Sequence, residues 1–159
     1  MLSENLPEAL RAEEALLPFR PGIDGPWNRA AAAHLARRAG FGMPEETVAR
    51  ILELEPRAAA AALLEKKPER EDVEFTSEAA RSLGSLEAAQ SAWVYRMLLG
   101  FNCAREKLTL FWHGHFATSQ RKVDDVRLMQ RQIDLFREKG TGPFEELLLG
   151  VARDPAMLV

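Results

Sequence analysis

Two histidines separated by one residue, His113 and His115, are the side chains of this chain best suited to chemistry. Imidazole nitrogens bind divalent metal ions, and the nearby Glu106 could act as a general base or orient a ligand. Metal-assisted hydrolysis is the reaction that such a set would support. A catalytic zinc site needs three protein ligands, however, so the two histidines require a third partner.

The helix that is expected to carry these histidines decides whether they can act together. Residues three, four and seven apart share a helical face, so Glu106, Thr109 and His113 form a mostly polar stripe. An unbroken helix would point the two imidazoles roughly 200° apart, because each residue turns it by about 100°. Gly114 lies between them, and glycine favours a helix end. The other face of this helix is a second stripe, apolar except for its last member, that contains Leu108, Phe111, Trp112 and His115. The pattern therefore leaves open whether the two histidines are a ligand pair or two separate structural histidines.

The segment around these histidines resembles a known family signature. Residues 105–119, REKLTLFWHGHFATS, are similar to the pattern R-E-K-[ML]-T-L-F-W-H-N-H-F-A-T of the bacterial family called domain of unknown function 1800. Residues 34–42, HLARRAGFG, resemble its opening H-L-L-R-R-A-G-F-G, and residues 154–158 resemble its D-P-A-M-L. Three blocks in the same order, over residues 27–159, argue against a chance match. Gly114 stands where the family pattern has Asn.

The resemblance implies a site and a fragment, but no reaction. His34, His113 and His115 are the only histidines, and all three lie in the matched blocks. If the helix of His34 packs on the motif helix, the three could complete an open site for a divalent metal. Members of the family are usually several times longer, and this chain ends in the apolar run 156–159. We therefore expect the N-terminal part of a larger helical domain, with its missing C-terminal part or another protein as a partner.

Composition excludes several classes of protein. Hydrophobic residues make up 47% and charged residues 28%, as in a soluble globular domain. The net charge of −3 comes from interspersed charges, which offer no basic face for nucleic acid. A single cysteine excludes an internal disulfide, and no apolar run approaches the ~20 residues of a membrane span. Relatives are often exported, but residues 1–17 lack the pattern of a signal peptide, so we expect a cytoplasmic protein.

Helical periodicity runs through the chain and predicts an all-α fold, an irregular bundle of about seven helices. Residues 1–26 are expected to hold a short helix at 4–17 and a Pro/Gly-rich lead-in, and residues 27–159 the helical domain. An Ala-rich helix follows, with Asn28 as N-cap and Gly40 after its end. Residues 66–76 are charged and broken by proline, which predicts an exposed linker. Two further helices are expected to begin at Pro44 and after Pro56, and another spans 77–100 with an interruption near Gly84. The helix of the motif is expected to follow the N-cap Asn102, and the next one to run from the cap Thr118 or Ser119 to Lys139. A last helix is expected at 144–152.

Two seams of apolar residues are expected to be core. The first is Leu86, Ala89, Trp93 and Met97, and the second is Val126, Met129, Ile133 and Phe136. In the last helix, Phe144, Leu147, Leu148 and Val151 are expected to point inward.

Taken together, these patterns predict an uncharacterised helical domain that serves as a structural or binding module. The alternative is part of a metal-dependent hydrolase in which His113, His115 and His34 bind the metal and Glu106 is the catalytic residue. Convergent, partly exposed imidazoles in a pocket would favour the enzyme. Buried imidazoles bonded within the protein would favour the module.

Overall fold

The computed structural model of the protein describes residues 17–116 and 118–158. That part of the chain forms nine α-helices, one short 3₁₀ helix and no strand, which confirms the predicted all-α class. None of the described helices is long and apolar enough to cross a bilayer. The elements are α2 (Arg29–Ala39), α3 (Glu45–Leu52), α4 (Pro56–Leu64), α5 (Glu71–Leu83), α6 (Leu86–Leu99), α7 (Cys103–Phe116), α8 (Gln120–Val123), α9 (Val126–Lys139), α10 (Phe144–Ala152) and η1 (Pro155–Met157).

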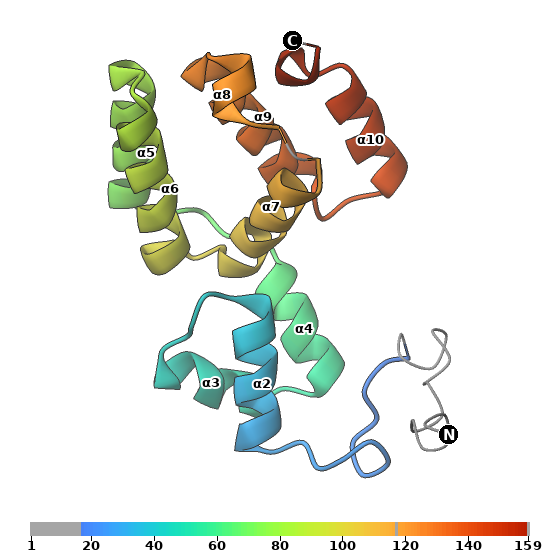
Figure 1. Cartoon of the computed structure of the whole chain (residues 1–159). Coiled ribbons are helices and arrows are strands. Elements are labelled where there is room, and N and C mark those ends of the chain that lie inside the picture. The colour runs from blue at the N-terminus through green and yellow to red at the C-terminus, as the bar shows by residue number, and fades with distance from the viewer. Residues whose placement is uncertain (1–16, 117, 159) are drawn as a thin grey trace, which may run out of the picture.

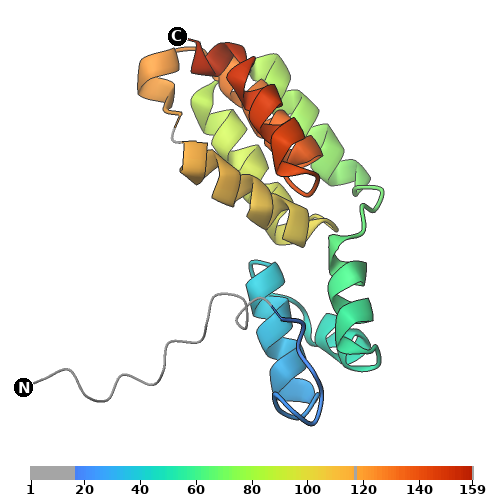
Figure 2. The same cartoon turned by 90° about the vertical axis from the view of Figure 1, so that its right-hand side faces the viewer.

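The helices form two groups that meet at α7 (Figures 1 and 2). The smaller group, α2 to α4, lies below α7 in Figure 1, and α5, α6 and α8 to α10 lie above it. α7 contacts α2 and α4 in the smaller group and α6 and α9 in the larger one. It is therefore the element that positions side chains of one group against the other.

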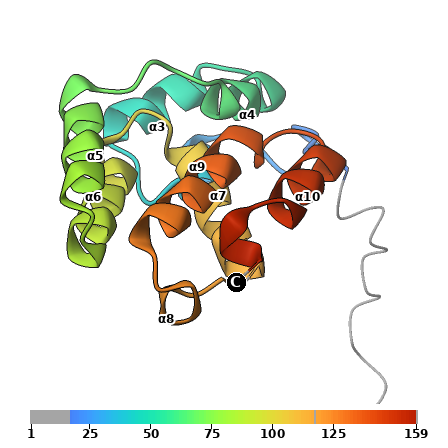
Figure 3. The ribbon, with the colours of Figure 1, turned by 90° about the horizontal axis from the view of Figure 1, so that it is seen from above.

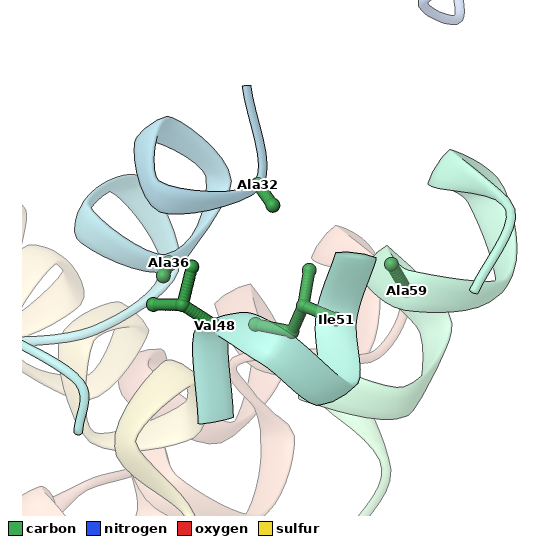
Figure 4. Close-up of a cluster of buried hydrophobic side chains, with 5 residues drawn as sticks. All are labelled: Ala32, Ala36, Val48, Ile51 and Ala59. Carbon is green, nitrogen blue, oxygen red and sulfur yellow. The ribbon is translucent and has the colours of Figure 1, made fainter. Parts of the chain in front are cut away.

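The smaller group packs around a cluster of short side chains (Figure 4). Ala32 of α2 and Ala59 of α4 are fully buried against Ile51 of α3. Alanines at a contact let helices approach closely, as the Ala-rich sequence of α2 predicts. The indole Nε1 of Trp27 donates to the carbonyl oxygen of Leu54 at 2.9 Å and ties the segment before α2 to the end of α3.

The larger group consists of the α5–α6 hairpin and the helices packed around α9. α5 and α6 form a helical hairpin, seen at the left of Figure 3. On the other side, α9 packs against both α7 and α10. Phe136 of α9 is buried with Leu147 and Val151 of α10. The predicted inward positions Phe144 and Leu148 were wrong, because α10 buries only the stripe that meets α9 and leaves these two side chains 52% and 45% exposed.

Several predicted boundaries are confirmed. The side chain of Asn28 accepts hydrogen bonds from the backbone N–H groups of Ala30 and Ala31, and α2 ends before Gly40. α10 spans the predicted residues 144–152. The interruption near Gly84 is also confirmed, since this glycine has a φ of 64° and ends α5 in the left-handed region that glycine tolerates best.

The linker predicted at residues 66–76 is wrong from residue 71 onward, where α5 begins. Its first turn contains Glu71, Asp72 and Glu74. Carboxylates there interact favourably with the positive end of the helix dipole, so the charges that suggested a linker instead favour a helix start. The first predicted helix, at 4–17, lies outside the described residues except for Leu17.

The helix predicted from Thr118 or Ser119 to Lys139 is divided in two. Asp124 has a φ of 51°, which ends α8 in the left-handed region. The side chain of Asp125 then accepts hydrogen bonds from the N–H groups of Arg127 and Leu128 and begins α9, whereas Ser119 makes no side-chain cap bond. α7 begins directly after Asn102, at the predicted position, and the N–H of Glu106 donates to the carbonyl oxygen of Asn102. The side chain of Asn102, however, bonds to the backbone of Lys67.

Mutation can show that Asp125, and not the predicted Ser119, is the residue that caps α9. Asp125→Ala should lower the free energy of unfolding by about 1 kcal/mol, since it removes the partner of two N–H groups. Ser119→Ala is the matched control and should change it by less than about 0.5 kcal/mol. Urea unfolding followed by circular dichroism measures both, and a larger loss from Ser119→Ala would contradict the assignment.

Candidate functional site

The histidines of the motif do not converge. α7 continues without interruption through Gly114 to Phe116, so His113 and His115 leave the helix roughly 200° apart. A Cβ built on Gly114 would meet no atom within 4 Å, so no close contact requires glycine at this position. The helix end that would have allowed both imidazoles to face one point is therefore not at Gly114.

His113 lies at the interface of α7 with α6. Its imidazole meets the ring of Trp93 edge-on, with centroids 5.6 Å apart. The Nδ1 atom is buried and has no hydrogen-bond partner in the described part of the protein. Burial lowers the pKa of His113 below its usual value of 6.5. Burial thus favours the neutral form of the ring, and Nδ1 has no hydrogen-bond partner among the described residues.

His115 has different surroundings on the other side of α7. Its imidazole is exposed and stacks on the ring of Phe111 at a centroid distance of 5.8 Å. The rings of Trp112 and Phe116 meet it edge-on at 5.7 and 5.2 Å. His115 therefore belongs to a partly exposed aromatic cluster and does not share a site with His113.

His34, the third predicted ligand, is exposed on α2 in the smaller group of helices. Among residues 17–116 and 118–158, no three His, Cys, Asp or Glu side chains come together in a group that could hold a metal ion. The structure therefore does not bring His34, His113 and His115 together as one ligand set.

Glu106, the candidate catalytic residue, is 1% exposed and forms the centre of a buried polar contact. Its Oε2 accepts a hydrogen bond from Nε1 of Trp93 at 2.9 Å and another from Nη2 of Arg137 at 3.1 Å. Its Oε1 accepts from Nε of the same arginine. Both carboxylate oxygens are thus bound by donors of α6 and α9, an arrangement that joins three helices.

Three further side chains of the motif bind carbonyl oxygens at the ends of helices. Lys107 Nζ donates to the oxygens of Arg37 and Gly40 at 2.8 and 2.6 Å, at the end of α2. These carbonyls have no partner within their own helix, and a cation there also favours the negative end of its dipole. Trp112 Nε1 donates to the carbonyl oxygen of Gly140, directly after α9, at 2.9 Å. Arg105 Nη1 donates to the carbonyl oxygen of Leu64, at the end of α4, at 3.4 Å.

α7 therefore buries residues of its polar stripe and exposes residues of its apolar stripe, the reverse of a simple amphipathic helix. Glu106 and Thr109, from the polar stripe, are 1% and 0% exposed, whereas Phe111 of the apolar stripe is 55% exposed. The hydroxyl of Thr109 is satisfied within the helix by the oxygen of Arg105 at 2.9 Å. Glu106 therefore binds neighbouring helices, whereas Thr109 bonds within α7.

A cavity of about 280 Å³ opens beside this contact, between the α5–α6 hairpin and the segment α8–α9. His113 is the residue of α7 that reaches it. Six of the eight residues of the two seams predicted as core line it, whereas Met97 and Phe136 do not, and Phe136 is buried as predicted. The wall residues are Leu86, Ala89 and Trp93 from α6 and Val126, Met129 and Ile133 from α9.

The cavity also holds charged residues that sequence reasoning did not single out. Arg81 lies 3.3 Å from Asp134, and Arg96 lies 3.3 Å from Glu69 and 2.9 Å from the hydroxyl of Ser77. Arg137 joins Asp134 to the buried Glu106 contact. No sequence pattern reveals the partners of these arginines.

Comparison with known proteins gives one match. The model of a family described as "Protein of unknown function (DUF1800)" matches residues 34–159. No curated protein and no solved structure matches the chain. The matched range begins at His34 and includes both histidines of α7 as well as the whole lining of the cavity.

The buried contact of Glu106 can be compared with an exposed ion pair. Glu106→Ala should lower the free energy of unfolding by about 3–5 kcal/mol, because it leaves Arg137 and Trp93 without their partner in a buried position. Glu45→Ala is the matched control, since its pair with Arg29 is mostly exposed, and it should cost less than about 1 kcal/mol. Chemical unfolding measures both, and equal losses would contradict the structural role of Glu106.

The lowered pKa of His113 makes stability depend on pH. The unfolded chain binds a proton near pH 6.5 and the folded chain only at lower pH, so the free energy of unfolding should fall as pH drops from 7 to 5. One proton limits the slope to about 1.4 kcal/mol per pH unit. His113→Phe should flatten this dependence, whereas His115→Phe should not. Unfolding curves at several pH values test this, and an unchanged slope in His113→Phe would refute it.

Proposed function

Since the chain belongs to the DUF1800 family, whose description names no reaction, we propose its function from the geometry: it is a helical binding module. α7 holds its helices together, and the cavity between α5–α6 and α8–α9 binds a small molecule. The observation that carries this proposal is the cavity itself, which is open and combines apolar walls from α6 and α9 with polar side chains from the surrounding helices. Small-molecule sites in proteins have this character.

The contacts of α7 support the structural half of the proposal. Glu106, Lys107 and Trp112 each bind a neighbouring helix through side-chain hydrogen bonds. These bonds explain the polar residues of the motif without a reaction. Metal-dependent hydrolysis has no observation in its favour, because the described histidines lie on different faces and elements.

The size of the cavity limits the molecule that it can admit. An apolar cavity of about 150 Å³ admits benzene, so one of about 280 Å³ has room for two fused rings. Its charged residues are paired, and the net charge of the chain is −3, so a small molecule is a better partner than nucleic acid. A cytoplasmic location stays a prediction from the sequence.

Binding of naphthalene tests the proposed site. Naphthalene should raise the melting temperature of the protein in a concentration-dependent way, because a ligand that binds only the folded state stabilises it. Ala89→Phe places a ring into the cavity from α6 and should abolish the shift. Thermal unfolding by circular dichroism gives the measurement.

Val94→Phe is the matched control on the same helix. Val94 is 53% exposed and does not line the cavity, so this variant should respond to naphthalene like the wild type. The proposal would be wrong if naphthalene left the melting temperature of the wild type unchanged, or if Ala89→Phe and Val94→Phe responded equally.

A further inference from the structure

Two residues of opposite charge lie side by side in the wall of the cavity. Arg81, from α5, and Asp134, from α9, both line it. Nη2 of Arg81 lies 3.4 and 3.3 Å from Oδ1 and Oδ2 of Asp134, so this ion pair joins the α5–α6 hairpin to α9. Because both residues line the cavity and their side chains are 44% and 43% exposed, a molecule in the cavity can contact both.

The other two arginines that line the cavity hold buried carboxylates. Arg96 binds Glu69, whose side chain is buried, and Arg137 binds the buried Glu106. A ligand that took either arginine would leave a buried carboxylate without its partner, which is strongly unfavourable. The exposed ion pair is therefore the charged site that the cavity offers to a ligand.

The balance of charge in this ion pair limits the charge of the ligand. Asp134 is also bound by Nη1 of Arg137, so it keeps a cationic partner when Arg81 turns to a ligand. A guanidinium group has five N–H donors in a planar fork that matches a carboxylate, and Arg81 directs Nη2 to Asp134. A carboxylate alone would add a negative charge beside Asp134, and an ammonium group alone would add a positive charge beside Arg81. A molecule that carries both groups keeps the balance and can pair each group with its opposite.

We infer that the cavity binds a free α-amino acid with an apolar side chain, its carboxylate on Arg81 and its ammonium group on Asp134. This inference rests on the proposed function of the cavity as a binding site. The apolar side chain then lies against the walls formed by α6 and α9, among them Trp93 and Ile133. A cavity of about 280 Å³ has room for an aromatic amino acid, since one of about 150 Å³ admits benzene.

The test compares three probes that share a phenyl ring. They are L-phenylalanine, 3-phenylpropionate, which lacks the ammonium group, and phenethylamine, which lacks the carboxylate. Their dissociation constants for the whole chain are measured by NMR titration at pH 7.5. The wild type should bind L-phenylalanine roughly three- to tenfold more tightly than either analogue, the range expected for one charged contact that is partly exposed to water.

Two variants remove the two contacts separately. Arg81→Met should abolish the preference for L-phenylalanine over phenethylamine, because the carboxylate loses its partner. Asp134→Asn should abolish the preference over 3-phenylpropionate. It should also tighten the binding of 3-phenylpropionate itself, because Arg81 is then released from its carboxylate partner. A merely structural role of the ion pair would weaken the binding of all three probes alike.

Two further variants serve as controls. Arg81→Lys keeps the positive charge and should retain most of the preference over phenethylamine. Arg131→Met removes an exposed arginine of α9 that does not line the cavity, and it should leave all three constants unchanged. Circular dichroism confirms that each variant is folded.

The outcomes distinguish this inference from the proposed function. If naphthalene binds and Ala89→Phe blocks it, but the preferences for L-phenylalanine are absent or survive in both Arg81→Met and Asp134→Asn, only the inference fails. Tightest binding of 3-phenylpropionate or of phenethylamine would replace the amino acid by an ion of a single charge and overturn the inference. If neither naphthalene nor any of the three probes binds, both proposals fail.

Discussion

The buried carboxylate of Glu106 is the constraint on which the rest of this structure depends. A charge that is 1% exposed needs compensating partners, and Trp93 and Arg137 supply three hydrogen bonds to it. Those partners belong to α6 and α9, so satisfying one side chain sets the positions of two helices against α7. His113 lies seven residues after Glu106, on the same face of α7, and therefore enters the space between α6 and α9 where the cavity opens.

α7 also donates hydrogen bonds to carbonyl oxygens at the C-terminal ends of neighbouring helices. Helices leave carbonyl oxygens unpaired at their C-terminal ends, and α7 satisfies such oxygens at α2 through Lys107 and at α9 through Trp112. A helix that buries its polar residues in this way has fewer positions at which to bury apolar ones. Phe111 and His115 are consequently left in a partly exposed aromatic cluster.

Sequence patterns were most reliable where the determining interaction is local. Asn28 accepts bonds from residues two and three positions later, and Gly84 needs only its own backbone freedom, so both were identified correctly. Patterns failed where two local signals competed, as in the charged first turn of α5, or where a single residue in the left-handed region divides a helix, as at Asp124. The predicted three-histidine site depended on how α2 meets α7, which no spacing along the chain contains.

The sequence by itself determined the helical class, most helix boundaries and the family, because these depend on periodicity, capping residues and ordered motifs within short stretches. Only the tertiary structure decided what the motif does. It showed that α7 does not end at Gly114, that Glu106 is bound by Trp93 and Arg137, and that most residues of two predicted core seams line a cavity. The physical reason is that a buried charge selects its partners in space, from residues that may lie anywhere along the chain.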